Sequence, residues 1–409
     1  MEMTAYACPS QDMSIKLFAG ILSTLARRVR VVWGMSMHAT KDRTPRVTPL
    51  DETTTRWSDW RWQLRHRCRN LRQLERFLEL SPPERQALEQ TREILPVAIT
   101  PYYLSLMHPG DPQDPLRRTL VPVMGEFATL PGDSPDPLDE ARDTVVPGVI
   151  RRHPDRVVLL ATGVCATYCR YCTRSRLVGG GEKLTGHWDQ AIAYIADHPE
   201  IRDVLISGGD PLLLSTSRLD GLLTRLRAIP HVELLRIGSR IPLVLPMRIT
   251  RKLVDMLRKH HPLAVSLHAI HPRELTPLAQ TALARLADAG IMLAGQTVLL
   301  AGINDSLPVL ADLMRGLLRN RVRPYYLYQC DPIPGSGHFR VPVEQGLRLM
   351  AGLQGHMSGY AVPRFVIDAP GGGGKIPLAS ETVVGRDARG WLLKNHLGEI
   401  FCYPEAFVE

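Results

Sequence analysis

The feature that most restricts the fold of this chain is a regular alternation of short apolar runs with amphipathic segments between residues 155 and 330. The apolar runs are typical of buried strands, and the segments between them have the spacing of helices. The runs are DRVVLLATGVC (155–165), DVLISGGDP (203–211), LLRIGSR (234–240), LAVSLHAI (263–270), IMLAGQTVLL (291–300) and RPYYLYQC (323–330). This alternation predicts a parallel sheet, either a barrel or a doubly wound sheet. In both architectures the chemistry lies at the carboxyl ends of the strands, where polar residues also cluster here.

Four regions follow from this pattern, and together they place the chain in the α/β class. Residues 1–55 are expected to form a poorly ordered extension, and residues 56–150 a helical N-terminal region. Residues 151–340 contain the alternating segment, and residues 341–409 form a C-terminal region.

Composition restricts the class of protein further. With 44% hydrophobic and 22% charged residues among 409, the chain reads as a soluble globular protein. The net charge is +9, but the basic residues are scattered and only seven of the fifty are lysine, so nucleic-acid binding is not favoured. The apolar run LFAGILSTLA is too short to cross a bilayer. We therefore expect a cytoplasmic protein that binds neither membrane nor nucleic acid.

Three of the seven cysteines are crowded into eight residues, as Cys165, Cys169 and Cys172 in the array CATYCRYC. Such crowding in a long chain indicates a reducing, intracellular setting and a metal site in place of a disulfide framework. Three thiolates cannot complete the four-ligand shell of zinc or of a four-cysteine 4Fe-4S cluster. One interpretation is a structural or zinc site with a remote fourth ligand. The interpretation we prefer is a 4Fe-4S cluster whose open iron binds the amino and carboxylate groups of S-adenosylmethionine.

At this point the sequence resembles the radical S-adenosylmethionine superfamily and, within it, the lysine 2,3-aminomutase family. The likeness runs from RWSDWRWQLRHR near residue 56 to PGGGGKIPL near residue 378. Uncommon strings in the same order carry it: CRYCTR, VLISGGDPLLL, RIGSRIPLVLPMRIT, RPYYLYQCD, HFR and VIDAPGGGGK. It implies a partial (β/α)6 TIM-like barrel with a C-terminal extension that carries a pyridoxal phosphate lysine. The activity that it implies is transfer of the α-amino group of L-lysine to C3, which gives β-lysine.

The SGGDP turn follows one of the predicted strands. Its two glycines let the backbone approach a ligand closely, so that free amides and carbonyls meet the amino group of a bound methionine. By itself this would be an ordinary strand-to-helix turn, and polar residues near later strand ends would be ordinary hydrogen-bonding groups. The resemblance implies that six residues bind S-adenosylmethionine: Ser207, Gly208, Gly209, Asp210, His268 and Gln296.

The run GGGGK ends at Lys375, and it is no phosphate-binding loop because Ile and Pro follow the lysine. A lone lysine on four glycines is either a flexible surface residue or a mobile amine that traps a carbonyl group. The resemblance implies that Lys375 carries pyridoxal phosphate and that Arg152 and Arg156, in RRHPDR, bind its phosphate. His153 stands where family members typically have tyrosine.

Two acids follow later predicted strands, Asp331 after YYLYQC and Asp368 within RFVIDAP. Each alone would be an ordinary cap or loop acid. The resemblance implies that both hold the distal ammonium of lysine and that Arg174, in CTRSR, pairs with the substrate α-carboxylate. Because glutamate-specific relatives replace these aspartates, their presence favours lysine over glutamate. Two carboxylates also suit a guanidinium, so an aminomutase for arginine is the nearest alternative.

The resemblance also implies an electron donor such as flavodoxin or ferredoxin, and a homo-oligomer. Some family members bind a structural zinc through a cysteine after an Asn-Asp turn and a cysteine cluster near the C-terminus. Here Ser306 follows Asp305 and the tail offers only Cys402, so we predict no such zinc. Modification of a lysine side chain within a protein is a second alternative, and a non-enzymatic iron–sulfur protein is a third. The run DAPGGGGK together with both aspartates argues against the second alternative, and the third would leave Lys375, Asp331 and Asp368 without a role.

Overall fold

The computed structural model describes residues 54–90, 95–179, 188–379, 382–387 and 390–404, all within one compact unit, Val47–Glu409. The expected N-terminal extension, residues 1–55, lies outside these ranges except for its last two residues.

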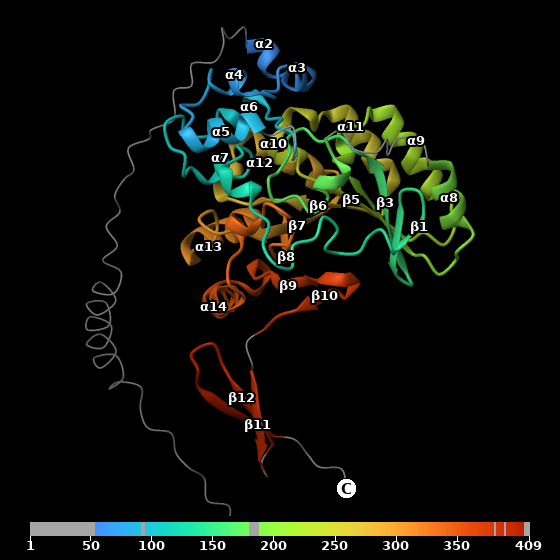
Figure 1. Cartoon of the computed structure of the whole chain (residues 1–409). Helices are drawn as coiled ribbons and strands as arrows, with labels where there is room; N and C mark the ends of the chain where they lie inside the picture. Colours follow the sequence, from blue (N-terminus) through green and yellow to red (C-terminus); the bar gives the residue numbers. More distant parts are fainter. Residues whose placement is uncertain (1–53, 91–94, 180–187, 380–381, 388–389, 405–409) are drawn as a thin grey trace, which may run out of the picture. The chain divides into compact units, whose positions relative to one another are not determined.

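A single sheet of ten strands dominates the described residues, and its spatial order follows the chain from β1 to β10 (Figure 1). Seven consecutive strands are parallel: β3 (Arg156–Thr162), β4 (Asp203–Gly208), β5 (Leu234–Ser239), β6 (Leu263–His268), β7 (Met292–Leu299), β8 (Arg323–Gln329) and β9 (Arg364–Ala369). The edges are antiparallel and consist of β1 (Thr144–Val146), β2 (Val149–His153) and β10 (Gly374–Pro377). The predicted α/β class with a parallel-rich sheet is confirmed.

The strand order never reverses, whereas a doubly wound sheet has a point where it does. The parallel sheet also does not end with the alternating segment, because β9 pairs with β8 in parallel register and β10 returns antiparallel to β9. The lysine-bearing segment is therefore part of the same sheet as the cysteine-bearing one.

Amphipathic helices connect the parallel strands and cover the sheet (Figure 1). They are α8 (Trp188–Ala196), α9 (Thr216–Arg227), α10 (Ile241–Val244), α11 (Arg251–Leu257), α12 (Pro277–Asp288), α13 (Leu307–Arg319) and α14 (Val343–Leu353). Ser215, Thr250 and Thr276 cap three of them by accepting a hydrogen bond from the third helical amide. The long helices bury most of their leucines against the sheet, so the core lies between the helices and the sheet.

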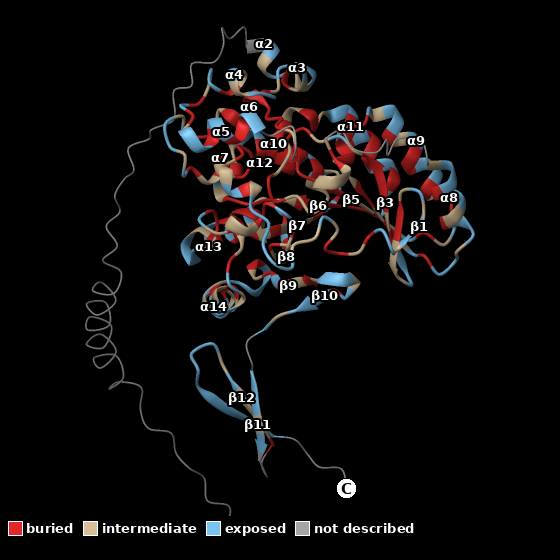
Figure 2. Cartoon of the chain, viewed as in Figure 1, coloured by how far each residue is buried: buried red, intermediate tan, exposed pale blue. Residues whose placement is uncertain are grey.

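Strand β6 is buried on both faces, as parallel strands usually are. In β6 every residue from Leu263 to Leu267 is buried, and only His268 at its carboxyl end is partly exposed. The carboxyl end of β6 is therefore accessible, while its other residues lie in the core of the sheet (Figure 2).

Short helices make up most of the regular structure that precedes β1. They are α2 (Thr54–Trp57), α3 (Trp60–Arg65), α4 (Leu71–Leu74), α5 (Pro82–Gln90), α6 (Pro101–Leu104) and α7 (Pro115–Arg118). Single 3-10 turns join many elements: η2 (Met124–Phe127), η3 (Ser175–Leu177), η4 (Pro211–Leu213), η5 (Pro246–Arg248), η6 (Arg258–His260), η7 (Pro272–Glu274), η8 (Gly337–Phe339), η9 (Gly359–Ala361) and η10 (Pro370–Gly372).

The last described residues form a separate three-stranded antiparallel sheet of β11 (Val383–Asp387), β12 (Gly390–Lys394) and β13 (Ile400–Pro404). In this sheet β11 and β13 are largely exposed and most of β12 is partly buried, in contrast to the parallel sheet. None of the helices in the described ranges has both the length and the apolar composition needed to cross a membrane.

Candidate active site

The three cysteines predicted to bind the cluster lie on the loop that follows β3. The Cys172 amide donates to the carbonyl of Cys169 at 3.2 Å, so the loop turns tightly between them. Burial raises the pKa of the Cys165 thiol well above its usual value, and the neighbouring Cys172 raises it further. Burial likewise raises the pKa of Cys172 to about 12, with a further contribution from Cys169. Cys165 and Cys172 therefore lie in poorly hydrated surroundings.

These thiols fit an iron–sulfur cluster better than a single metal ion. Within the described ranges, no three His, Cys, Asp or Glu side chains converge closely enough to hold one ion. In a 4Fe-4S cluster each thiolate binds a different iron, so its ligands stand further apart than those of one zinc ion. A metal also turns a buried neutral thiol into a bound thiolate, which offsets the cost of its burial.

The cysteine loop is held by residues from earlier in the chain. Arg170, between two of the cysteines, forms a buried ion pair with Glu126, with its Nε 2.8 Å from Oε2. Its Nη1 donates to the Leu95 carbonyl at 2.7 Å. Arg67 donates from Nη1 to the Cys165 carbonyl at 2.6 Å. The N-terminal helical region thus positions the loop.

The glycine turn after β4 is pressed against the same loop. Gly208 has a φ of 108°, and a Cβ there would lie 2.4 Å from the Thr162 carbonyl oxygen. A Cβ on Gly209 would lie 2.5 Å from the Val164 carbonyl oxygen. The amides of Gly209 and Asp210 donate to these two carbonyls, at 2.5 and 2.9 Å. The sequence predicts that glycines here admit a ligand, whereas in the structure they admit the backbone that leads into the cysteine loop.

Asp210, predicted to contact S-adenosylmethionine, joins the ends of β4 and β5. Its carboxylate accepts from the Ser239 hydroxyl and from the Arg240 amide, each at 2.8 Å. Burial raises the pKa of this carboxyl to about 6, while the hydrogen bonds lower it. Both carboxylate oxygens are used within the protein, so any effect of Asp210 on a ligand passes through the two strand ends that it fixes.

Arg240 is a site residue that the sequence analysis missed. Its Nη1 donates to the sulfur of Cys169 at 2.7 Å, and its Nη2 donates to Glu274 at 2.7 Å and to the Tyr103 hydroxyl at 2.9 Å. Its Nε is buried and has no partner among the described residues. The residue follows a predicted strand directly, in RIGSR, and that position was a signal available in the sequence.

His268 and Gln296 meet at the carboxyl side of the sheet. His268 is the last residue of β6 and stands directly opposite Gln296 of β7, so their side chains share one face. Burial lowers the pKa of His268 to about 4, and Arg240 and Arg174 lower it further, which leaves the imidazole neutral near pH 7. A neutral imidazole both donates and accepts a hydrogen bond.

Arg174 follows the last cysteine by two residues, and Glu140 holds its guanidinium. Arg174 Nη2 lies 2.6 Å from Glu140 Oε1, while its Nη1 donates to the Ser207 hydroxyl at 3.2 Å. Glu140 is only 4% exposed and also contacts Arg176, which pairs with Asp136 at 2.9 Å. The segment 136–143, which we call the strap, therefore binds Arg174 and Arg176 through its acidic side chains. The sequence analysis did not identify this segment.

The predicted phosphate-binding arginines lie on the two antiparallel strands that precede the cysteine loop. Arg152 on β2 donates from Nε to Asp143 of the strap at 2.7 Å. Arg156, the first residue of β3, pairs across the strands with His153. The His153 ring is 4.0 Å from the position that a Cβ on Gly374 would occupy. The structure thus brings this end of β2 and β3 to the glycine run.

Lys375 lies on a strand, although the sequence suggests a free glycine-rich loop. It is the second residue of β10 and pairs directly with Asp368 of β9. The glycines make the turn of this hairpin, in which Gly371, Gly372 and Gly374 have φ of 69°, 83° and 75°. Because residues with side chains rarely adopt positive φ, the glycine run is required by the turn itself.

The hairpin places the predicted coenzyme lysine beside the predicted substrate acids. Lys375 Nζ lies 2.8 Å from Asp368 Oδ1 and 5.3 Å from the centre of the Tyr328 ring. The Thr173 hydroxyl donates to Asp331. Burial raises the pKa of Asp331 to about 6, and the nearby charge of Asp368 raises it further. Asp331, Asp368 and Lys375 therefore form one electrostatically coupled group at the ends of β8 and β9.

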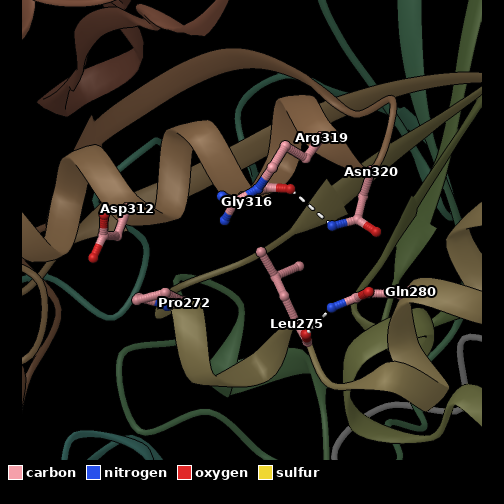
Figure 3. A pocket seen from close by; sticks show the side chains of 7 residues that line it. All are labelled: Pro272, Leu275, Gln280, Asp312, Gly316, Arg319 and Asn320. Atoms are coloured by element: carbon pink, nitrogen blue, oxygen red, sulfur yellow. Dashed lines mark hydrogen bonds between the residues drawn. The ribbon is translucent and has the colours of Figure 1, made fainter. Parts of the chain in front are cut away.

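A hollow of about 530 Å³ lies elsewhere, between η7, α12 and α13 (Figure 3). It is lined by Pro272, Leu275, Gln280, Asp312, Gly316, Arg319 and Asn320. None of the predicted site residues borders it. It belongs to the outer, helical layer, so its volume gives no information about the chemistry of the sheet.

Comparisons with known proteins identify one family of similar sequences. A family model described as lysine-2,3-aminomutase matches residues 350–407. An L-lysine 2,3-aminomutase of Fusobacterium nucleatum is 48% identical over 355 residues, which cover 86% of this chain and 84% of that protein. The enzyme of the same name from Bacillus subtilis is 47% identical, over 87% of this chain and 76% of its own length. A glutamate 2,3-aminomutase of Clostridioides difficile is 36% identical, over 86% of this chain and 83% of its own.

These three relatives are all named as 2,3-aminomutases, a class of isomerase. The chain belongs to the lysine 2,3-aminomutase family.

Proposed function

We propose that this protein is an L-lysine 2,3-aminomutase, an isomerase that moves the α-amino group of lysine to C3 and forms β-lysine. The observation that supports lysine as the substrate is the pair Asp331 and Asp368. These acids follow or end adjacent strands and interact electrostatically with each other and with Lys375. Two carboxylates at one point provide strong attraction for the distal ammonium of lysine and would repel the carboxylate of glutamate.

Arg174 would bind the α-carboxylate at the opposite end of the substrate. Its guanidinium is fixed by Glu140, yet its Nη1 faces the Ser207 hydroxyl, at the start of the glycine turn. Arginine binds carboxylates through parallel hydrogen bonds, so a fixed guanidinium orients a bound α-carboxylate. The acid pair and Arg174 would bind the two ends of the amino acid, so the separation between them selects substrates of a matching length.

The donor set accommodates the three groups that the family uses. Cys165, Cys169 and Cys172 would hold the 4Fe-4S cluster, and Lys375 would carry pyridoxal phosphate. S-adenosylmethionine would lie between the cluster and the residues at the ends of β4, β6 and β7. Together these groups supply hydrogen-atom abstraction at an unactivated carbon and a conjugated system that spreads radical spin.

Residues that surround the site would hold the substrate and the bound groups in position. We place the site at the mouth of a partial (β/α)6 barrel, which the sequential strand order supports. Neutral His268 and Gln296 offer hydrogen bonds without adding charge, and the buried pairs of the strap keep the arginines in fixed directions. Asp368 is buried and Asp331 is partly buried, which limits the access of water to the acid pair and strengthens its attraction for a cation.

The function is tested by an anaerobic assay of cluster-loaded protein with S-adenosylmethionine, pyridoxal phosphate and dithionite. L-Lysine, L-arginine and L-glutamate are offered separately, and β-amino acids and 5'-deoxyadenosine are measured by mass spectrometry. We expect β-lysine from lysine and no product from glutamate. A β-amino acid from arginine alone would replace lysine as the substrate, and 5'-deoxyadenosine without any isomer would overturn the aminomutase assignment.

A further inference from the structure

One surface of the N-terminal region carries a concentration of positive charge that the mechanism does not use. Residues 56–76 contain seven arginines and two acids, which leaves a net charge of +5 against +9 for the whole chain. The basic residues are therefore less evenly scattered than the composition suggests. Six of the arginines are exposed and form what we call the arginine surface: Arg56, Arg61, Arg65, Arg69, Arg72 and Arg76.

The arginine surface is almost free of compensating acids. Arg65 lies 3.8 Å from Asp59, and none of the other five has an acidic partner within the described ranges. The surface follows α2, α3 and α4, which lie together at one end of the molecule in Figure 1. Unpaired arginines attract an acidic partner over a range of about 10 Å at ordinary ionic strength.

This surface is joined directly to the cysteine loop. Arg67, in the same segment, donates to the carbonyl of Cys165 at 2.6 Å. The neighbouring Cys68 exchanges two backbone hydrogen bonds with Ile99, at 2.9 and 3.0 Å, and the Tyr168 amide donates to the adjacent Ala98 carbonyl at 3.3 Å. A partner bound here would thus stand next to the loop that carries the cluster ligands.

We propose that the arginine surface is the docking site of a small acidic one-electron carrier protein that reduces the cluster. The proposal rests on the proposed function, whose chemistry starts from a reduced cluster and therefore needs one electron from an external donor to begin. The reduced carrier loses one electron and the cluster gains it, passing from the 2+ to the 1+ state, with no proton transferred. Charge attraction sets the rate of encounter, and the contact with the cysteine loop keeps the path for the electron short.

A nucleic acid is a poorer match for the same charges. Single-stranded nucleic acids bind through aromatic rings on which bases stack. Here the Trp62 ring already stacks on His66, with centroids 4.2 Å apart. The guanidinium carbons of Arg61 and Arg248 lie 4.6 and 4.8 Å from the centre of the Trp60 ring. Trp60 and Trp62 thus already make contacts within the chain that compete with base stacking, which favours recognition by charge.

The chain offers a matched control on the opposite edge of the sheet. Arg258 and Lys259 in η6 immediately precede β6, whereas the cysteine loop follows the carboxyl end of β3. Both residues are exposed, and neither has an acidic partner within the described part of the chain. The double variants R69E/R72E and R258E/K259E change the net charge by the same amount.

The test measures cluster reduction by a stopped-flow loss of absorbance, without amino acid substrate, so it does not depend on aminomutase activity. Reduced flavodoxin is the carrier, and dithionite is the reductant in a parallel experiment. We expect R69E/R72E to slow reduction by flavodoxin about tenfold or more at low ionic strength, with the difference shrinking as salt is added. Reduction by dithionite is unchanged in both variants, and R258E/K259E behaves like the parent with either reductant.

Equal rates of reduction by flavodoxin in R69E/R72E and R258E/K259E would overturn the docking site. So would tight binding of a single-stranded oligonucleotide that R69E/R72E abolishes while the flavodoxin rate stays normal. Equal iron content and melting temperature of the two variants establish that both are folded. Failure of the lysine assay with intact flavodoxin reduction would instead count against the proposed function alone.

Discussion

At the scale of single residues, the site is organised by arginines that are each fixed by an acid. Glu140 holds Arg174, and Glu274 holds Arg240. A guanidinium presents several donors in a rigid plane, so one carboxylate can fix its direction and leave other donors free. The sequence places Arg240 directly after a strand and Arg174 just after the cysteine array, but their acids come from distant segments and no local pattern links the partners.

Arg240 provides a prediction about the cluster. A buried cation that donates to the sulfur of Cys169 stabilises the more negative, reduced state, so we expect R240Q to lower the reduction potential. A loss of about 1.4 kcal/mol corresponds to about 59 mV for one electron. An EPR-monitored redox titration measures this shift. R240K keeps the charge and is expected to show a smaller one, and an unchanged potential in R240Q would contradict the role of Arg240.

Asp331 provides a prediction about pH. Because its pKa is raised to about 6, its carboxyl is mostly neutral below that pH and ionised above it. Attraction for the substrate ammonium therefore increases as the pH rises through 6, and KM for lysine should fall over this range. In D331N the pH dependence should vanish and KM should rise by two to three powers of ten, because leaving a buried charge unpaired costs about 3–5 kcal/mol.

Steady-state assays with dithionite from pH 5 to pH 8 measure these KM values. D312N, at the outer hollow and distant from the sheet ends, serves as the control and should leave KM unchanged. A D331N enzyme with the parental KM would remove Asp331 from the substrate site.

At the scale of elements, two turns of the sheet depend on glycine for different reasons. The turn after β4 needs close approach to the cysteine loop, and the turn between β9 and β10 needs positive φ. In both turns glycine is required by the way the chain packs or reverses there. The requirement therefore follows from the arrangement of the strands more than from local sequence.

The first of these turns provides a prediction. In G209A the new methyl group would lie 2.5 Å from the Val164 carbonyl oxygen, so the turn and the cysteine loop must separate. We expect G209A to lower both the melting temperature and the iron content of reconstituted protein. G221A, on α9 where nothing lies within 4 Å of the new methyl group, should instead stabilise the protein by about 0.5–1 kcal/mol. Normal iron content in G209A would contradict this account of the turn.

At the scale of the whole molecule, segments far apart in the chain share one site. The helical N-terminal region, the strap, the cysteine loop and the C-terminal hairpin each contribute a contact, and the sheet joins them from β1 to β10. The C-terminal sheet of β11, β12 and β13 differs, because large apolar residues on both of its faces are exposed.

This second sheet provides a prediction about assembly. In β13, Ile400 is 60% exposed, Phe401 54% and Tyr403 63%, although neighbouring residues in a strand point to opposite faces. A three-stranded sheet with two exposed apolar faces is a poor independent unit, so we expect a second copy of the chain to cover it. Sedimentation velocity of the full chain should show a dimer or larger oligomer. The double variant F401S/Y403S should shift it towards monomer.

The control for assembly changes apolar residues outside this sheet. Leu278 and Met292 are 48% and 58% exposed, and L278S/M292S should sediment like the parent. A parent chain that remains monomeric at every concentration would contradict the prediction.

The sequence by itself determined the α/β class, the parallel strands and the family, because periodicity and ordered motifs are local properties of a chain. Tertiary structure alone decided that Lys375 lies on a strand opposite Asp368, that Arg240 reaches Cys169 and that Glu140 holds Arg174. Each of these contacts joins residues whose closeness depends on the register and order of the strands. Register is set by the packing of the whole sheet, so no short stretch of sequence contains it.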